Sequence, residues 1–198
     1  MYNNLLLQYE NHKNINILAF TDRKNCTRDF LAQIEKVAKN KPNAIVLREK
    51  DLEEKEYFKL AQAIIPICKA YNVPLIIHSF YQAALELGID KIHMPLSKLK
   101  EISQTDIKKF SVIGASTHSL EDVIDAKEHN ATYVTAGHIF ETNCKSGLKG
   151  RGLDFLQNIV ENSNIPVYGI GGIHLDNVEK VLQTGCFGVC VMSETNLL

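Results

Sequence analysis

Eight short hydrophobic runs, separated by segments with a helical pattern, constrain the fold of this chain more than any other feature. The runs are rich in β-branched residues and continuous rather than alternating, as parallel strands are when both faces of the sheet are covered. In chain order they span residues 15–20, 44–47, 74–77, 91–93, 111–114, 133–136, 166–169 and 188–191. Strict alternation of eight strands with helices predicts an α/β protein, a single (β/α)8 TIM barrel, with an open doubly wound sheet as the alternative.

Helices are predicted between the strands because apolar residues recur there at the 3.6-residue period. Asp51 is placed to cap the second helix, and Ser119 to begin a later one. The other predicted helices cover residues 27–39, 81–87, 98–108, 120–129, 153–161 and 175–183, and residues that tolerate a left-handed backbone end helices near Asn72, Gly88, Asn130 and Gly185. Only residues 193–198 follow the eighth strand, so the eighth helix is expected to be truncated or missing.

Length, charge and cysteine content narrow the class of protein. The chain has 198 residues, of which 45% are hydrophobic, and this predicts one domain over residues 1–198. A formal net charge of -1 without a basic block gives no support for binding to nucleic acid or to an anionic membrane. No apolar run approaches the roughly 20 residues of a membrane span, and no signal peptide is recognised, so we expect a cytoplasmic protein. The five cysteines form no C-x-x-C pair and are interpreted as reduced thiols.

Candidate functional residues follow the strands, because active sites of such barrels form at the carboxyl ends of the strands. The polar residues there include several histidines and cations: Arg48, Lys50, His78, His93, Ser116, His118, His138, Thr142, Lys145 and Arg151. This set predicts an anionic small-molecule ligand and chemistry that transfers protons. A metal cluster is not expected, because one histidine per strand does not provide the ligand geometry of zinc.

The turns after the seventh and eighth strands predict a phosphate site. Gly171 and Gly172 follow the seventh strand, and Met192 and Ser193 follow the eighth. Glycines let backbone N–H groups approach a phosphate closely, and these two loops are the usual phosphate site of such barrels. The alternative is a tight turn without a ligand.

His138 directly follows the sixth strand and is the candidate acid and base, since a neutral imidazole can take up and return a proton near pH 7. The alternative is a histidine that is only hydrogen-bonded to backbone groups at a strand end. For His78, His93 and His118 the structural role is favoured. Lys145 and Arg151, with glycines between them, indicate either a mobile cationic flap or a solvated surface loop.

Three segments carry a resemblance to a known family. They are residues 45–51 (IVLREKD), 114–119 (GASTHS) and 165–173 (IPVYGIGGI), and they resemble the thiamine phosphate synthase superfamily over roughly residues 20–193. The synthases of that superfamily join a pyrimidine pyrophosphate to a thiazole phosphate with magnesium, and place acidic residues after the third and fourth strands. This chain has Ser79 and Ser97-Lys98 in those regions, without a carboxylate.

Residues 137–152 (GHIFETNCKSGLKGRG) instead look like the thiazole tautomerase branch. That resemblance implies a cofactor-independent isomerase without a metal, in which His138 shuttles a proton on a thiazole carboxylate phosphate. It also implies that Gly171, Gly172, Met192 and Ser193 hold the phosphate, and that Arg48, Lys50, Ser116, Thr142 and Lys145 bind substrate or close the site. The alternatives are a thiamine phosphate synthase, which is a transferase, and a non-catalytic binder of thiamine precursors with a regulatory role.

The short segment after the eighth strand predicts an assembly. A missing helix would expose apolar surface beside the eighth strand, at a cost of about 25 cal/mol per Å2. Either residues 5–9 (LLLQY) fold across the gap or a second subunit covers it. Because symmetric dimers are the commonest oligomers, we expect a homodimer with its interface near the eighth strand, and a monomer is the alternative.

Overall fold

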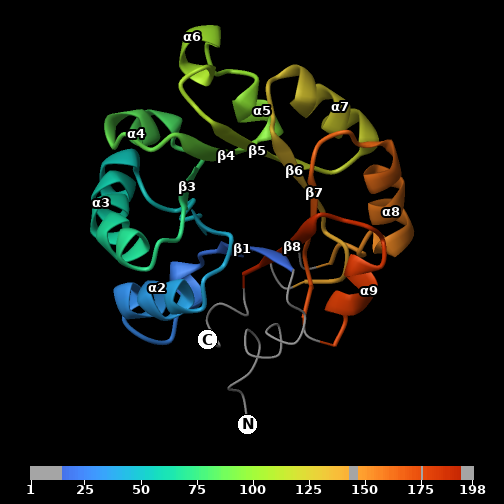
Figure 1. Ribbon diagram of the computed structural model, residues 1–198, viewed down its shortest axis with the longest axis horizontal. Helices are drawn as coiled ribbons and strands as arrows, with labels where there is room; N and C mark the ends of the chain where they lie inside the picture. Colours follow the sequence, from blue (N-terminus) through green and yellow to red (C-terminus); the bar gives the residue numbers. More distant parts are fainter. Residues whose placement is uncertain (1–14, 143–146, 175, 193–198) are drawn as a thin grey trace. The chain divides into compact units, whose positions relative to one another are not determined.

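A computed structural model describes residues 15–142, 147–174 and 176–192 of the chain. Its eight parallel strands form a closed barrel in the order β1 to β8 (Figure 1). The strands are β1 (Asn16–Phe20), β2 (Ala44–Leu47), β3 (Leu75–His78), β4 (Lys91–Pro95), β5 (Val112–Thr117), β6 (Tyr133–Gly137), β7 (Val167–Ile170) and β8 (Gly188–Val191). The predicted α/β barrel is therefore confirmed, with every strand at its predicted place.

The chain divides into two compact units. Unit 1 comprises residues 1–92 and 191–198, and unit 2 comprises residues 93–190. The interpretation of residues 1–198 as one domain stays a prediction, and the two units are described separately.

In unit 1, strands β1, β2 and β3 pair in parallel, with Ala19 opposite Ile45 and Ile45 opposite Leu75. The helices that follow these strands, shown in blue to green in Figure 1, cover their outer side. These helices are α2 (Phe30–Lys39), α3 (Glu54–Ala70) and α4 (Tyr81–Glu86), and the 3-10 helix η1 (Arg23–Asn25) precedes α2 in the chain.

In unit 2, strands β5 to β8 pair in parallel, and Ser116 of β5 lies opposite Thr135 of β6. The helices of this unit are α5 (Leu96–Leu99), α6 (Gln104–Ile107), α7 (Leu120–Glu128), α8 (Gly152–Asn162) and α9 (Val178–Leu182). Strand β8 contains Cys190, Cys186 precedes the strand, and both thiols are buried and free.

Two helix predictions were wrong in detail. Asp51 does not cap α3, whose N-cap is Glu53; the Asp51 carboxylate is instead 2.7 Å from the Arg23 guanidinium. The single helix expected over 98–108 is divided into α5 and α6, because the Ser103 side chain accepts a hydrogen bond from the Asp106 N–H and starts a new helix. By contrast, Ser119 caps α7 as predicted, and Asn72, Gly88, Asn130 and Gly185 all have positive φ.

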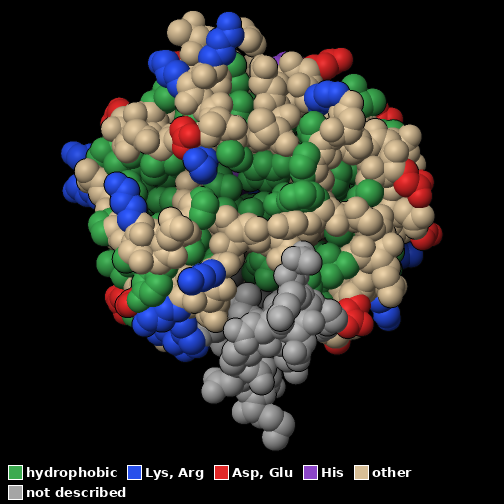
Figure 2. Space-filling model, in the orientation of Figure 1, with side chains coloured by type: hydrophobic (Ala, Val, Ile, Leu, Met, Phe, Trp, Pro, Cys, Tyr) green, Lys and Arg blue, Asp and Glu red, His purple; other side chains and the backbone are tan. Residues whose placement is uncertain are grey.

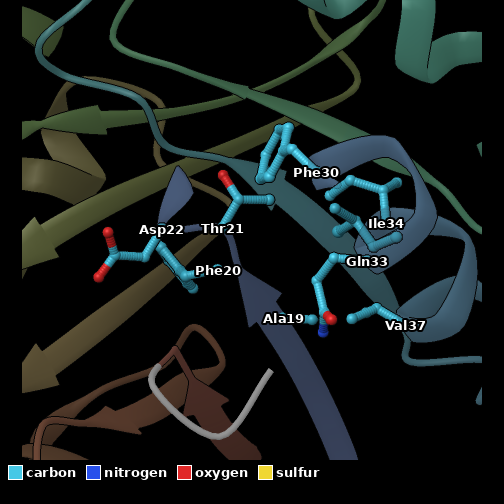
Figure 3. A pocket seen from close by; sticks show the side chains of 9 residues that line it. Ala19, Phe20, Thr21, Asp22, Phe30, Gln33, Ile34 and Val37 are labelled. Atoms are coloured by element: carbon cyan, nitrogen blue, oxygen red, sulfur yellow. The ribbon is translucent and has the colours of Figure 1, made fainter. Parts of the chain in front are cut away.

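A small cavity lies between α2 and β1 in unit 1. Its volume is about 10 Å3, enough for about one water molecule, and its lining is mostly apolar. Figure 3 shows side chains of α2, among them Gln33, Ile34 and Val37, facing Ala19 of β1. The cavity therefore belongs to the packing of the helix on its strand, and is too small for an organic substrate.

Among residues 15–142, 147–174 and 176–192, no helix is long and apolar enough to span a membrane. On the face drawn in Figure 2, Lys and Arg side chains are interspersed with Asp and Glu. Residues 5–9 and 193–198, on which the predictions of a missing eighth helix and of a dimer interface depend, lie outside the described residues. The homodimer stays a prediction.

Gly114 of β5 yields the first testable prediction. A Cβ at this position would lie 2.2 Å from Cζ of Tyr133 and 2.4 Å from Nδ1 of His93, both buried. Because a packed interior cannot absorb an added methyl group there, Gly114→Ala should lower the free energy of unfolding by about 1–3 kcal/mol or more. Urea denaturation followed by circular dichroism measures this loss, and the exposed Lys108→Ala is the control. Equal stability of the two variants would contradict the described packing.

Candidate functional site

The carboxyl ends of the strands carry a cluster of polar residues in each unit. In unit 1 the cluster is built around Glu49, which follows β2 and is 3% exposed. Its carboxylate accepts hydrogen bonds from the Thr21 hydroxyl at 2.6 Å and from the backbone N–H of Arg23 at 3.1 Å. The hydroxyl of Thr21 also accepts a bond from the Arg48 N–H. Glu49 thus fastens the loop after β1 to the end of β2.

Arg48 and Met192, predicted from separate strand ends, come together in unit 1. An Nη1 of Arg48 lies 3.7 Å from the Met192 sulfur, and the Arg48 side chain is half-buried. Lys50, two residues further on, is exposed. The structure therefore places a cation beside the start of the loop after β8, where a phosphate site was predicted.

Burial raises the pKa of Glu49, and the hydrogen bonds from Thr21 and Arg23 only partly oppose this effect. A folded-state pKa above the unfolded value means that the folded protein holds the proton more tightly. The stabilisation from this group is complete below the unfolded pKa of about 4.5 and is lost as the pH rises through the folded pKa.

We therefore expect the unfolding free energy of the wild type, relative to Glu49→Gln, to fall as the pH rises above 4.5 and then to level off. Urea denaturation of both proteins over a pH series measures the difference, and groups common to both cancel. A difference that increases with pH would show that the hydrogen bonds outweigh burial.

In unit 2, His138 follows β6 and is 7% exposed. Its Nε2 lies 3.2 Å from the carbonyl oxygen of Leu148, and its Nδ1 is buried without a hydrogen-bond partner among the described residues. Since a carbonyl only accepts, Nε2 carries the hydrogen, and Nδ1 of the neutral ring is an acceptor. The imidazole is therefore anchored on one side and able to accept a hydrogen bond on the other.

The glycine turn after β7 lies against His138. Gly171 has φ +100°, and a Cβ there would be 2.4 Å from Cβ of His138. The next residue, Gly172, has φ +65°, and its carbonyl accepts a hydrogen bond from the Asn177 side chain. The turn thus packs closely on the segment after β6, and the phosphate site at this turn stays a prediction.

The remaining strand ends of unit 2 are also polar. Ser116 of β5 lies 2.9 Å from Nε2 of His93, and the Thr117 hydroxyl donates to the carbonyl of Thr135. Nδ1 of His118 is 2.8 Å from the Gly137 carbonyl oxygen. His93 and His118 therefore both contact other groups of the protein, and the contact of His93 with Ser116 links it to a candidate substrate residue. Their structural role stays a prediction.

The flap is described only in part. Lys145 and Ser193 lie outside the described residues, and Thr142 is half-buried. The guanidinium of Arg151 lies 5.2 Å from the ring centroid of Phe155, and the Arg151 N–H donates to the carbonyl of His138.

Sequence reasoning missed the hydrogen-bond partners that hold the strand-end residues in place, above all Tyr133, Thr21 and Glu49. Tyr133 stands within a hydrophobic run, where nothing marks its hydroxyl as functional.

The magnesium that the superfamily implies does not fit the side chains that are described. No group of three His, Cys, Asp or Glu side chains that could hold a metal occurs among residues 15–142, 147–174 and 176–192. Ser79 and Lys98, near the ends of β3 and β4, offer no carboxylate. In unit 1, Glu49 is bound by Thr21 and Arg23, and Asp51 is paired with Arg23. A hard cation needs free oxygen ligands, so we assign no step to a metal.

Comparison with known proteins decides the family. Residues 17–195 match the thiamine monophosphate synthase family. The chain belongs to that family. It is 36% identical to the thiamine-phosphate synthase of Clostridium acetobutylicum, covering 87% of this chain and 83% of the relative. It is 32% identical to a putative thiamine-phosphate synthase 2 of Aquifex aeolicus, covering 89% and 95%.

A solved structure agrees with this assignment. Thiamine phosphate pyrophosphorylase from Pyrococcus furiosus superposes with a TM-score of 0.78 at 28% identity, over 93% of this chain and 88% of that one.

These relatives overturn the thiazole tautomerase interpretation. Relatives such as that of Clostridium acetobutylicum are named thiamine-phosphate synthase, a transferase, so both the tautomerase function and the isomerase class inferred from residues 137–152 were wrong. The family resemblance itself is confirmed. The error came from weighing one loop and two missing carboxylates above the similarity of the whole chain.

The glycine turn gives a prediction for ligand binding. Gly171→Ala would place a methyl group on His138 and force an alanine into a backbone conformation that favours glycine. We expect the affinity for inorganic phosphate, measured by calorimetry, to fall more than about tenfold, since hydrogen bonds to a charged group are lost. The control is Gly88→Ala, which has positive φ but open space around its Cβ. Unchanged phosphate affinity in Gly171→Ala would exclude this turn as the site.

Proposed function

We propose that this chain catalyses the reaction for which its relatives are named, the formation of thiamine phosphate. The observation that carries the proposal is the match of residues 17–195 to the thiamine monophosphate synthase family. The substrates implied by the family resemblance are a thiazole phosphate and a pyrimidine pyrophosphate. One bond to the thiazole forms, the bond to pyrophosphate breaks, and pyrophosphate leaves with the electron pair.

Unit 2 supplies one part of the site that we propose for the thiazole phosphate, the turn at Gly171 and Gly172, because glycines let backbone N–H groups approach a phosphate closely. Met192 and Ser193, which belong to unit 1, stay predicted contacts of a phosphate. His138 lies directly against Gly171, and its buried Nδ1 is an acceptor without a hydrogen-bond partner among the described residues. The proton shift that the tautomerase interpretation assigned to His138 is not part of this proposal.

Unit 1 contains the cations that we propose for binding the pyrophosphate. When pyrophosphate leaves, negative charge builds up on it, and fixed positive groups stabilise this charge. Arg48 is half-buried at the end of β2, where the Thr21–Glu49 contact holds the backbone, and Lys50 follows in the same loop. We propose both as leaving-group contacts, with Ser116, Thr142 and Lys145 as further substrate contacts.

An assay of the full chain with both substrates tests the proposal, with thiamine phosphate and pyrophosphate measured in the presence and absence of Mg2+. We expect product, and a loss of about 10²–10³-fold in turnover for Arg48→Met, the usual effect of removing one transition-state donor. Arg28→Met, an exposed arginine of the same unit, should be unchanged.

One result would contradict this function, and another would contradict the role of Arg48. Thiazole phosphate bound without any product would favour the non-catalytic alternative. Full turnover in Arg48→Met would remove that residue from the site.

A further inference from the structure

Three side chains of unit 2 form a hydrogen-bonded chain, of which the proposed function uses only Ser116. The Tyr133 hydroxyl on β6 lies 2.9 Å from Nδ1 of His93 on β4, and Nε2 of His93 lies 2.9 Å from Oγ of Ser116 on β5. His93 is fully buried and Tyr133 is 6% exposed. Ser116 is half-buried and stands near the carboxyl end of its strand. We call these residues the Tyr133–His93–Ser116 relay.

The relay depends on a missing side chain. A Cβ on Gly114 would lie 2.4 Å from Nδ1 of His93 and 2.4 Å from the Tyr133 hydroxyl oxygen, and would push both away. Since side chains two residues apart in a strand share a face, Ser116 stands on the same face as this gap. On strand β5, Gly114 thus leaves space for the buried His93 and Tyr133, and Ser116 contacts Nε2 of His93.

The hydrogen positions in the relay follow from what each group can donate and accept. A neutral imidazole has one donor nitrogen and one acceptor nitrogen. Within the described residues, the only hydrogen bond of the Tyr133 hydroxyl is the one to His93. Burial raises the pKa of Tyr133 well above its usual value, so the hydroxyl keeps its hydrogen. That hydrogen has to be donated to Nδ1, because a buried donor without an acceptor is strongly disfavoured.

The consequence reaches Ser116. With Nδ1 as the acceptor, His93 carries its hydrogen on Nε2 and donates it to the Ser116 oxygen. The hydrogen of the serine hydroxyl is then left for another acceptor. The opposite tautomer, or an imidazolium, would leave the Tyr133 hydrogen without an acceptor inside the protein.

We propose that Tyr133 and His93 are positioning residues that make Ser116 a hydrogen-bond donor to an anionic oxygen of a phosphate or pyrophosphate. Such an oxygen only accepts hydrogen bonds, so a serine that presented its lone pairs would repel it. The proposal rests on the proposed function only for the kind of anion; the direction of the hydrogen bonds follows from the relay itself.

The tautomer of His93 is a direct test that needs neither substrate nor turnover. In 15N NMR of the full chain with labelled histidine, His93 should show a protonated Nε2 and an unprotonated Nδ1. Assignment of the signals uses a His93→Gln variant, in which they disappear. A protonated Nδ1 in the wild type would overturn the proposal.

Binding of inorganic pyrophosphate tests the consequence. We expect Ser116→Ala to weaken binding about tenfold or more, as for a lost hydrogen bond to a charged group, and Tyr133→Phe to weaken it several-fold. In a Ser116→Ala background, Tyr133→Phe should cause no further loss, because it acts through the serine.

Tyr168→Phe is the matched control. This residue is 7% exposed, and its ring packs edge-on against Tyr133 at 5.5 Å, but it is not part of the relay, so pyrophosphate affinity should be unchanged. Equal weakening by both Tyr→Phe changes, or additive effects of Tyr133→Phe and Ser116→Ala, would reduce the relay to a structural role.

The two proposals fail in different ways. Absence of thiamine phosphate, together with the expected tautomer and non-additive binding, would contradict the function and leave the relay intact. Thiamine phosphate formation with the other tautomer, or with no pyrophosphate binding by the wild type, would contradict the relay alone.

Discussion

Burial of parallel strands on both faces is the constraint on which the rest of this structure depends. A polar group inside such a sheet is stable only when it is hydrogen-bonded. Three buried polar residues follow this rule: His93 contacts Tyr133, Thr117 donates to a backbone carbonyl, and Glu49 accepts from Thr21. Each of these hydrogen bonds therefore has a fixed donor and a fixed acceptor. This determines which donors and acceptors remain for a ligand.

Absent side chains shape the site as much as those present. Gly114 leaves space for the His93–Tyr133 contact, and Gly171 allows a turn to lie directly on His138. In both places a Cβ would fall within 2.4 Å of a neighbour. These two glycines thus mark places where two elements of the structure approach closely. Both places lie beside candidate functional residues, His93 and His138.

The acidic side chains near the end of β2 are already bound within the protein. Glu49 and Asp51 are both acids near the end of β2, yet one is bound by the loop after β1 and the other is paired with Arg23. The described polar groups available to a ligand are instead cations, hydroxyls, an imidazole nitrogen and backbone. Such a set is suited to phosphate groups, the chemistry shared by both substrates of the proposed reaction.

The sequence by itself determined the fold class, the places of all eight strands and most of the helix ends, because hydrophobic periodicity and left-handed caps are local properties. It also indicated the strand-end residues Arg48, Ser116, His138 and Gly171, since barrel topology alone brings such positions to one edge. It could not determine the partners. Tyr133 was interpreted as a core residue, His93 as a structural residue and Asp51 as a helix cap. A hydrogen bond such as that between His93 and Tyr133, which are 40 residues apart, leaves no local signal in the sequence. Only the tertiary structure decided which acid is buried and which serine is oriented, because both depend on side chains that the folded strands bring within about 3 Å of each other.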